Sequence, residues 1–229
     1  MSSNVSGRRI RAVHNRLRKV QGEFVPKPAR PILDELVLTV LSQHTSDINS
    51  GRAFEGLRTR FDSWDEVLAA PADELADSIR AGGIADVKAR RIQAILGDIE
   101  GREGAIDLKR LNVLSDTEVE EYLCSLPGVG PKTAACVLVF SMGRPAFPID
   151  THVHRIVQRL GWMGPKDNAE AVHRRLTPSI PPDIRYSLHV AFIEHGRTVC
   201  KARTPRCSEC VLLDLCTAGP RLLAAGEAV

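Results

Sequence analysis

The sequence predicts an all-α protein. Aromatic residues make up only 4% of the 229 residues, and no stretch shows the valine-rich alternation of a half-buried strand. Apolar residues instead recur every three or four positions, which is the period of a helix with one buried face. Consecutive helices with short connections pack as bundles around a common core. We therefore expect about ten helices and no strand.

The composition is that of an ordinary globular chain, with 43% hydrophobic and 26% charged residues. No apolar run approaches the ~18 residues that a membrane-spanning helix needs. The N-terminus lacks the apolar core of a secretory signal. We expect a cytoplasmic protein without a membrane partner.

The first 30 residues form a basic segment. Its net charge is +7, against +3 for the whole chain, and its single acid is Glu23. Apolar residues at Ile10, Val13, Leu17 and Val20 predict an amphipathic helix here, ended by the prolines that follow. Such a segment favours a polyanionic partner, although a solvated tail has the same composition. Its cations are Arg8, Arg9, Arg11, Arg16, Arg18, Lys19, Lys27 and Arg30.

The other helices follow from spacing and from end signals. Ser63 with Glu66 and Ser115 with Glu118 fit capping boxes, and consecutive glycines at 82 and 83 end a helix. Proline at 131 suits the first position of a helix, and glycine at 143 suits its exit. The predicted helices cover 32–41, 47–61, 71–81, 92–99, 131–142, 151–160, 167–176 and 182–195.

Four of the six cysteines crowd into 17 residues near the end of the chain. Disulfide frameworks usually staple a small fold throughout, so this local cluster favours a metal site. Zinc and a [4Fe–4S] cluster both accept four thiolates, and the spacing alone leaves both open. The pattern is C-x6-C-x2-C-x5-C, formed by Cys200, Cys207, Cys210 and Cys216.

Cations lie in and beside the first cysteine interval, and no acid occurs from 195 to 206. A metal-closed loop would hold Arg197, Lys201, Arg203 and Arg206 outward, where they could bind phosphates. The same cations would also offset the negative charge of a thiolate-bound group. The two roles are compatible.

The segment LPGVG, residues 126–130, predicts a tight turn between two helices. Gly128 and Gly130 can adopt positive φ and allow a close backbone approach. Their amides, with the start of the next helix, would form a positive pocket for a phosphate. A tight turn without a ligand is the alternative.

Lys132 opens the helix after this turn. The partial positive charge of a helix start disfavours an ammonium there, and the neutral amine is a nucleophile that forms Schiff bases. An exposed surface lysine is the alternative. Asp150 is expected to cap the helix 151–160. Because apolar FPI precedes it, its carboxylate is expected to be partly shielded and close to Lys132.

Three segments, LPGVGPKTA, PIDTHVHRI and HGRTVC with the remaining cysteines, together resemble the endonuclease III family of the helix-hairpin-helix superfamily. The resemblance spans roughly residues 32–216. It implies two helical lobes with a DNA-binding cleft between them. A six-helix barrel would cover 34–144 with the hairpin 126–130, and residues 1–33 plus 145–229 would form an iron–sulfur cluster domain. It also implies a [4Fe–4S] cluster on the four cysteines and a monovalent cation at the hairpin.

The resemblance further implies a base-excision-repair DNA glycosylase with AP-lyase activity. Lys132 would attack the sugar C1′, and Asp150 would assist by activating the lysine or stabilising positive charge on the sugar. A Schiff base and β-elimination would follow. The implied substrate is double-stranded DNA with an oxidised pyrimidine such as thymine glycol, or an abasic site. The implied protein is a monomer, associated with the nucleoid and of bacterial or archaeal type.

The segment LSQHTSD, residues 41–47, resembles the family segment that fills the gap left by a flipped base. The family commonly has glutamine where this chain has His44, so either His44 or Gln43 would be the wedge. Ile84 matches a second apolar wedge, with a buried isoleucine as the alternative. Asp47 and His152 match residues that line the lesion pocket, and a helix-surface position is the alternative for His152.

Three other functions stay open at this point. The same fold would serve a glycosylase for T·G or U·G mispairs or for oxidised purines. The departure at His44 also allows a weakly active or non-catalytic DNA-binding paralogue.

Overall fold

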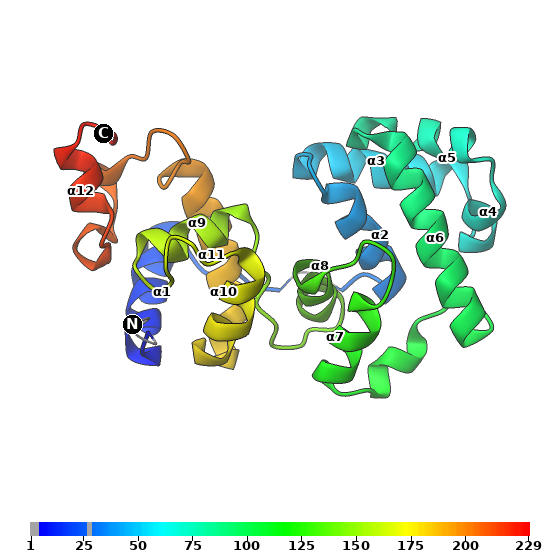
Figure 1. Ribbon diagram of the computed structural model, residues 1–229, viewed down its shortest axis with the longest axis horizontal. Helices are drawn as coiled ribbons and strands as arrows, with labels where there is room; N and C mark the ends of the chain where they lie inside the picture. The colour runs from blue at the N-terminus through cyan, green and yellow to red at the C-terminus, as the bar shows by residue number, and fades with distance from the viewer. Residues whose placement is uncertain (1–4, 27–28) are drawn as a thin grey trace. The chain divides into compact units, whose positions relative to one another are not determined.

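The computed structural model describes residues 5–26 and 29–229, so Lys27 of the basic segment lies outside the described residues. The described residues contain twelve α-helices, several short 3-10 turns and no strand, which confirms the all-α prediction. The chain divides into two compact units (Figure 1). Unit 1 is Met1–Lys27 with Pro145–Val229, and unit 2 is Pro28–Arg144.

Unit 1 is built from helices at both ends of the chain. Its apolar core includes Phe147 and Phe192, whose rings meet edge to face with centroids 6.5 Å apart. Trp162 packs on Phe192 at 5.8 Å. The helices are α1 (Gly7–Gln21), α9 (Thr151–Arg159), α10 (Ala169–Leu176), α11 (Arg185–Thr198) and α12 (Gly219–Ala224).

Helix α1 packs on α11 through the apolar face that the sequence predicts. Ile10, Val13 and Leu17 are fully buried, whereas Val20 is 61% exposed. The expectation that Val20 belongs to the buried face is therefore wrong. The helix ends one residue later at Gln21, where Gly22 adopts φ 85° and leaves the helical path.

Two arginines of α1 are bound within unit 1. Arg11 forms an ion pair with Asp183 at 2.7 Å, and Arg16 pairs with Asp214 and also donates to the Val211 carbonyl at 3.1 Å. These cations therefore anchor α1 to the rest of unit 1, which gives part of the basic segment an internal function.

Unit 2 contains the helices that carry the hairpin and the predicted wedge residues. Leu36, Val40, Leu57, Ile92 and Leu96 are among its fully buried side chains. The helices are α2 (Ile32–Ser42), α3 (Asp47–Arg60), α4 (Trp64–Ala69), α5 (Ala72–Ser78), α6 (Ala85–Glu103), α7 (Asp116–Cys124) and α8 (Pro131–Cys136).

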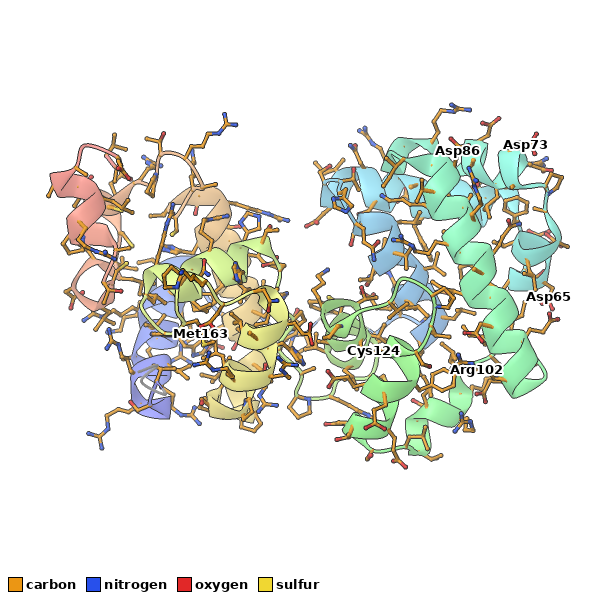
Figure 2. The ribbon with its side chains drawn as sticks, viewed as in Figure 1. Asp65, Asp73, Asp86, Arg102, Cys124 and Met163 are labelled. Atoms are coloured by element: carbon orange, nitrogen blue, oxygen red, sulfur yellow. The ribbon has the colours of Figure 1, made fainter. Side chains whose placement is uncertain are left out.

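Helix α6 is the longest helix in the described residues and packs against α2, α4 and α5. Figure 2 shows Asp86 and Arg102 near its opposite ends. The acid lies in the first turn and the base in the last, which matches the helix dipole. Arg102 also donates to Asp98 and to the Ser125 hydroxyl at 2.6 Å. Helix α6 is therefore in contact with other segments of unit 2 at both of its ends.

Three predicted helix ends can be compared with the structure. Ser115 and Glu118 form the predicted capping box. At Ser63 only half of the predicted box forms, because the Glu66 carboxylate accepts from the Asp62 amide at 2.9 Å instead. The helix predicted over 71–81 ends at Ser78, and a 3-10 turn, Arg80–Gly82, follows it.

No helix within the described ranges is both long enough and apolar enough to cross a bilayer.

Candidate active site

The hairpin connects α7 to α8 and is anchored by apolar side chains. Leu126 and Val129 are 2% and 6% exposed, and the Val129 amide donates to the Leu126 carbonyl at 3.2 Å. Gly128 adopts φ 70°, as expected for this turn. Gly130 differs from the expectation, because it caps α8 in an extended conformation with φ −113°.

Helix α8 begins with Pro131 and places Lys132 at its second position, half-buried. The next four residues, 133–136, are buried, and α8 packs against α2 and α7. The helix continues as a π-helical segment over Val137–Ser141, in which the Met142 amide donates to the Val137 carbonyl at 3.2 Å. Lys132 therefore lies at the start of a helix whose following residues are buried.

The carboxylate of Glu35 lies in the surroundings of Lys132. Glu35 is 5% exposed, on the face of α2 that belongs to the unit 2 core. It pairs with Arg30 at 3.4 Å and accepts from the Thr39 hydroxyl at 3.5 Å. Burial raises the pKa of Glu35, and the positive charges of Arg30 and Lys132 act in the opposite direction. This carboxylate contributes negative potential to the environment of the lysine.

The Glu35→Gln substitution is expected to stabilise the protein by about 1 kcal/mol above neutral pH. The folded-state pKa of Glu35 lies above its unfolded value, so ionisation opposes folding, and stability is lost as pH rises through the folded value. Glutamine keeps the Thr39 contact without the charge. Thermal unfolding at several pH values should show the gain shrinking towards pH 4. The matched control Glu100→Gln removes a charge from an exposed site of α6, and an equal gain there would contradict the burial argument.

Asp150 caps α9 as predicted. Its Oδ1 accepts from the Val153 amide at 2.7 Å, and the backbone before the helix is extended. The apolar residues before it, Phe147 and Ile149, are 0% and 3% exposed. The cap therefore fixes the orientation of a carboxylate at the edge of the unit 1 core, with its second oxygen outside the capping bond.

His152 is the second residue of the same helix and lies against α11. Its Nδ1 is 3.0 Å from Arg155 Nη2, and a Cβ added at Gly196 would lie 2.6 Å from this nitrogen. The glycine therefore allows the two helices to approach. This contact is the helix-surface role considered above, and the pocket role of His152 stays a prediction.

The predicted wedge residues have unusual backbone conformations. His44 has φ 56° and Ile84 has φ 41°, and they are the two non-glycine residues with positive φ in the described part of the chain. Such values are strained, especially for a β-branched side chain. Ile84 is 54% exposed, which excludes the buried alternative.

Gln43 and His44 differ in their contacts. The Gln43 side chain is half-buried, and its Oε1 accepts from Arg91 Nη1 at 2.6 Å. The neighbouring His44 is exposed. Asp47 follows as the first residue of α3, after the capping residue Ser46. The structure therefore holds Gln43 inward and presents His44 outward.

The four predicted cysteine ligands line one pocket in unit 1. Arg159 Nη1 donates to Cys200 Sγ at 3.3 Å, and the Gly219 amide donates to Cys216 Sγ at the same distance. A Cβ at Gly219 would lie 2.8 Å from Leu213 Cδ1, so a larger residue here would require the Leu213 side chain to move. The pocket is lined by Cys200, Cys207, Cys210 and Cys216 together with apolar residues that include Leu212 and Leu222.

The chemistry of this pocket suits thiolates held by a metal group. Burial raises the pKa of the Cys210 thiol to about 11 and also raises that of Cys207. Metal binding would therefore release protons here. The Arg159 guanidinium and the Gly219 amide donate to Cys200 Sγ and Cys216 Sγ, and such donors stabilise an anionic sulfur. The four thiols, with the Arg159 and Gly219 donors beside two of them, form a ligand set that an iron–sulfur group accepts.

Three residues of this region were missed at the sequence level. Arg155 donates to the Cys200 and Gly196 carbonyls at 2.9 Å each, and Arg159 donates to the Lys201 and Ala202 carbonyls. His195 is 3% exposed and lies 3.6 Å from Cys210 Sγ, and burial lowers its pKa to about 4. The spacing of Arg155 and Arg159, four residues apart on α9, indicates that both face the same side of the helix, and this could have pointed to a shared contact.

The cations of the basic loop before Cys207 are exposed, and one of them, Arg206, is held in an ion pair. Arg206 forms an ion pair with Glu209 at 2.9 Å. Lys201 and Arg203 are exposed in the same loop, and Arg197 is exposed at the end of α11. The Arg159 bonds fix the backbone of this loop, so its cations are carried on an ordered segment.

The fold and the hairpin define a class of DNA repair proteins. Residues 37–182 match the HhH-GPD superfamily of base excision DNA repair proteins, and residues 200–216 match the iron–sulfur binding domain of endonuclease III. The solved structure of a non-covalent endonuclease III–DNA complex superposes with a TM-score of 0.82 at 29% identity, covering 96% of this chain and 99% of that chain.

The chain belongs to the endonuclease III family. It is 36% identical to endonuclease III of Thermotoga maritima over 79% of this chain and 80% of that protein. For endonuclease III of Bacillus subtilis, the identity is 35% over 82% of each. An Arabidopsis thaliana relative is 39% identical over 72% of this chain, which spans 57% of the plant protein. The chain is a base-excision-repair DNA glycosylase of this family. Since relatives include a plant protein, the bacterial or archaeal origin stays a prediction.

Proposed function

We propose that the chain is a bifunctional glycosylase and AP lyase that removes oxidised pyrimidines of the thymine glycol type from double-stranded DNA. The observation that carries the proposal is Lys132 at the second position of a buried helix, directly after the glycine hairpin. A binding module has no need for a half-buried lysine at this point. Asp150, with its carboxylate oriented by the α9 cap, supplies the second functional group.

The reaction needs both residues at the same sugar. Lys132 Nζ, as a neutral amine, attacks C1′ of the damaged nucleotide, and the C1′–N bond breaks. The departing base takes the bonding electron pair and a proton. Asp150 accepts the proton from the lysine or stabilises the positive charge that develops on the sugar. The C1′–O4′ bond of this adduct then breaks, O4′ takes up a proton, and a Schiff base joins Lys132 to C1′ of the opened sugar. The Schiff base loses a C2′ proton, and β-elimination breaks the C3′–O bond, with the 3′ phosphate as the leaving group.

The reaction also requires the damaged base to leave the duplex. Unstacking costs a few kcal/mol and is least costly at damaged pairs, which contributes selectivity. We assign His44 to the vacated space, because Gln43 is held by Arg91 while His44 is exposed. Ile84 is the second wedge, Gly128 and Gly130 approach the DNA backbone, and Asp47 and His152 line the lesion pocket. Lys201 and Arg203 contact phosphates, with Arg197 and Arg206 beside them.

The cofactor is proposed to be a [4Fe–4S] cluster on Cys200, Cys207, Cys210 and Cys216, with a monovalent cation at the hairpin. When bound, the cluster is a structural group that closes the loop. The protein side chains carry the reaction itself. Arg159 stabilises the anionic Cys200 sulfur, and the loop that it fixes presents the phosphate-binding cations.

The Cys210→Ser substitution is expected to remove the cluster, because serine is a poor ligand for iron in such a site. The purified variant should lack iron, inorganic sulfide and visible absorbance, and its affinity for DNA should fall. The control Cys124→Ser changes a cysteine of α7 in unit 2 and should retain the iron, the sulfide, the visible absorbance and the affinity for DNA. Stoichiometric zinc in a colourless wild-type protein would contradict the cluster assignment.

A panel of duplexes with single lesions tests the substrate and the chemistry together. We expect base release and borohydride trapping with thymine glycol and other oxidised pyrimidines, and weak activity on mispairs and oxidised purines. Faster release from T·G, U·G or an oxidised purine would replace the proposed substrate by one of those. Salt-sensitive DNA binding without any base release or trapping would show a non-catalytic paralogue.

A further inference from the structure

A lysine outside the catalytic group is the most buried cation among the described residues. Lys88, in the first turns of α6, is 1% exposed. Its Nζ donates to the Leu41 carbonyl at 2.7 Å and to the Gly82 carbonyl at 2.8 Å. Removing an ammonium from water is costly unless its hydrogen bonds are well formed. The two carbonyl bonds therefore offset part of the cost of burying Lys88, and the segments that supply these carbonyls indicate what the lysine does.

The two carbonyls belong to the two segments that carry the wedge residues. Leu41 lies in the last turn of α2, three residues before His44, and Gly82 ends the 3-10 turn two residues before Ile84. Both His44 and Ile84 are exposed and have positive φ. Such conformations cost about 1–3 kcal/mol each and persist only where surrounding contacts hold them. Lys88 supplies a contact to each segment.

Arg91 lies one turn further on the same face of α6. Its Nη1 donates to Gln43 Oε1 at 2.6 Å, directly beside His44. Its side chain also fills the space next to Gly128, where an added Cβ would lie 2.5 Å from Arg91 Nε. Arg91 therefore contacts both the segment of the first wedge and the hairpin.

We propose that Lys88 and Arg91 are positioning residues that fix the His44 segment, the Ile84 segment and the hairpin to α6 as one rigid frame. The inference rests on the proposed insertion of His44 and Ile84 into DNA. Two wedges must enter the duplex at a fixed separation from the hairpin that holds the backbone. Misplacement of about 1 Å at such a site lowers a rate by about 10²-fold. The alternative is that the two cations only fill space between helices.

Two variants and one matched control test the frame in the full-length protein. Lys88→Met and Arg91→Met each remove a cation and keep an apolar side chain of similar length. Arg90→Met removes the same charge from an exposed neighbour whose Nε reaches only the Asp86 carbonyl of its own helix. The duplex carries thymine glycol with 2-aminopurine as the adjacent base, so that wedge insertion is read as a rise in fluorescence.

We expect Lys88→Met and Arg91→Met to lose most of the fluorescence rise and to release the base about 10²-fold more slowly per folded molecule. Their affinity for undamaged duplex should match that of Arg90→Met. A space-filling role would lower stability and leave the fluorescence rise of the folded molecules intact, and that result would overturn the proposal. If Lys88→Met does not fold, the Arg91→Met variant is sufficient for the test, and a wild-type fluorescence rise in that variant overturns the proposal.

Hydrogen exchange separates this inference from the proposed function. Amides of residues 42–45 and 83–87 should exchange faster in both variants than in wild type, while the α6 core amides stay protected. This readout does not need a substrate. Failure of the wild-type protein on every lesion would reject the proposed function, whereas unchanged exchange in both variants would reject the frame.

Discussion

Replacing Lys132 by glutamine is expected to abolish strand cleavage and borohydride trapping on thymine glycol duplexes. The amide cannot attack C1′, so base release should fall by at least about 10³-fold. Affinity for the duplex should remain close to wild type, because the hairpin and the basic loop are unchanged. Glutamine is a good helix residue and adds no volume to the buried base of α8. Single-turnover base release and gel analysis of trapped complexes measure the two effects.

The matched control is Lys109→Gln, which removes a lysine from an exposed 3-10 turn of the same unit, paired with Asp107 at 2.7 Å. It should cleave and trap like wild type. A Lys132→Gln protein that still cleaves DNA at the wild-type rate would show that the amine has no part in the reaction. Loss of base release together with loss of DNA binding would indicate instead a folding defect of the hairpin.

The helices and the cysteine group could be predicted because their signals are local. The buried face of α1, the capping box at Ser115 and the Asp150 cap all depend on residues within a turn of each other. Where the local signal was incomplete, the prediction was wrong. The Glu66 carboxylate accepts from the Asp62 amide, one residue before the cap, where the capping-box pattern predicts the Ser63 amide as the donor.

The contacts that define the candidate site lie beyond such local patterns. Lys88 is 47 residues from Leu41, and Arg91 is 48 residues from Gln43. In the sequence both cations look like the polar face of an amphipathic helix. Glu35 likewise reads as an exposed acid in the first turn of α2, where it favours the helix dipole. Only tertiary packing shows that Lys88 and Glu35 are buried, that Arg91 is partly buried, and which groups the two cations contact.

The Asp150→Asn substitution is expected to separate the chemical role of Asp150 from its structural role. Asparagine caps helices about as well as aspartate, so the bond to the Val153 amide and the stability of unit 1 should be retained. Base release should nevertheless fall by about 10²–10⁴-fold, the usual contribution of a general acid or base. Asp150→Ala should show the same loss of activity and an additional destabilisation of about 1 kcal/mol.

The neighbouring cap at Asn168 provides the matched control for this pair. Asn168 Oδ1 accepts from the Ala171 amide at 2.8 Å at the start of α10, in the same unit. Asn168→Ala should lose about 1 kcal/mol of stability and keep its rate of base release. Thermal unfolding and single-turnover kinetics on the same preparations measure both quantities. Full activity in Asp150→Asn would show that the cap, and not the charge, is the contribution of this residue, and base release would then depend on Lys132 without a carboxylate partner.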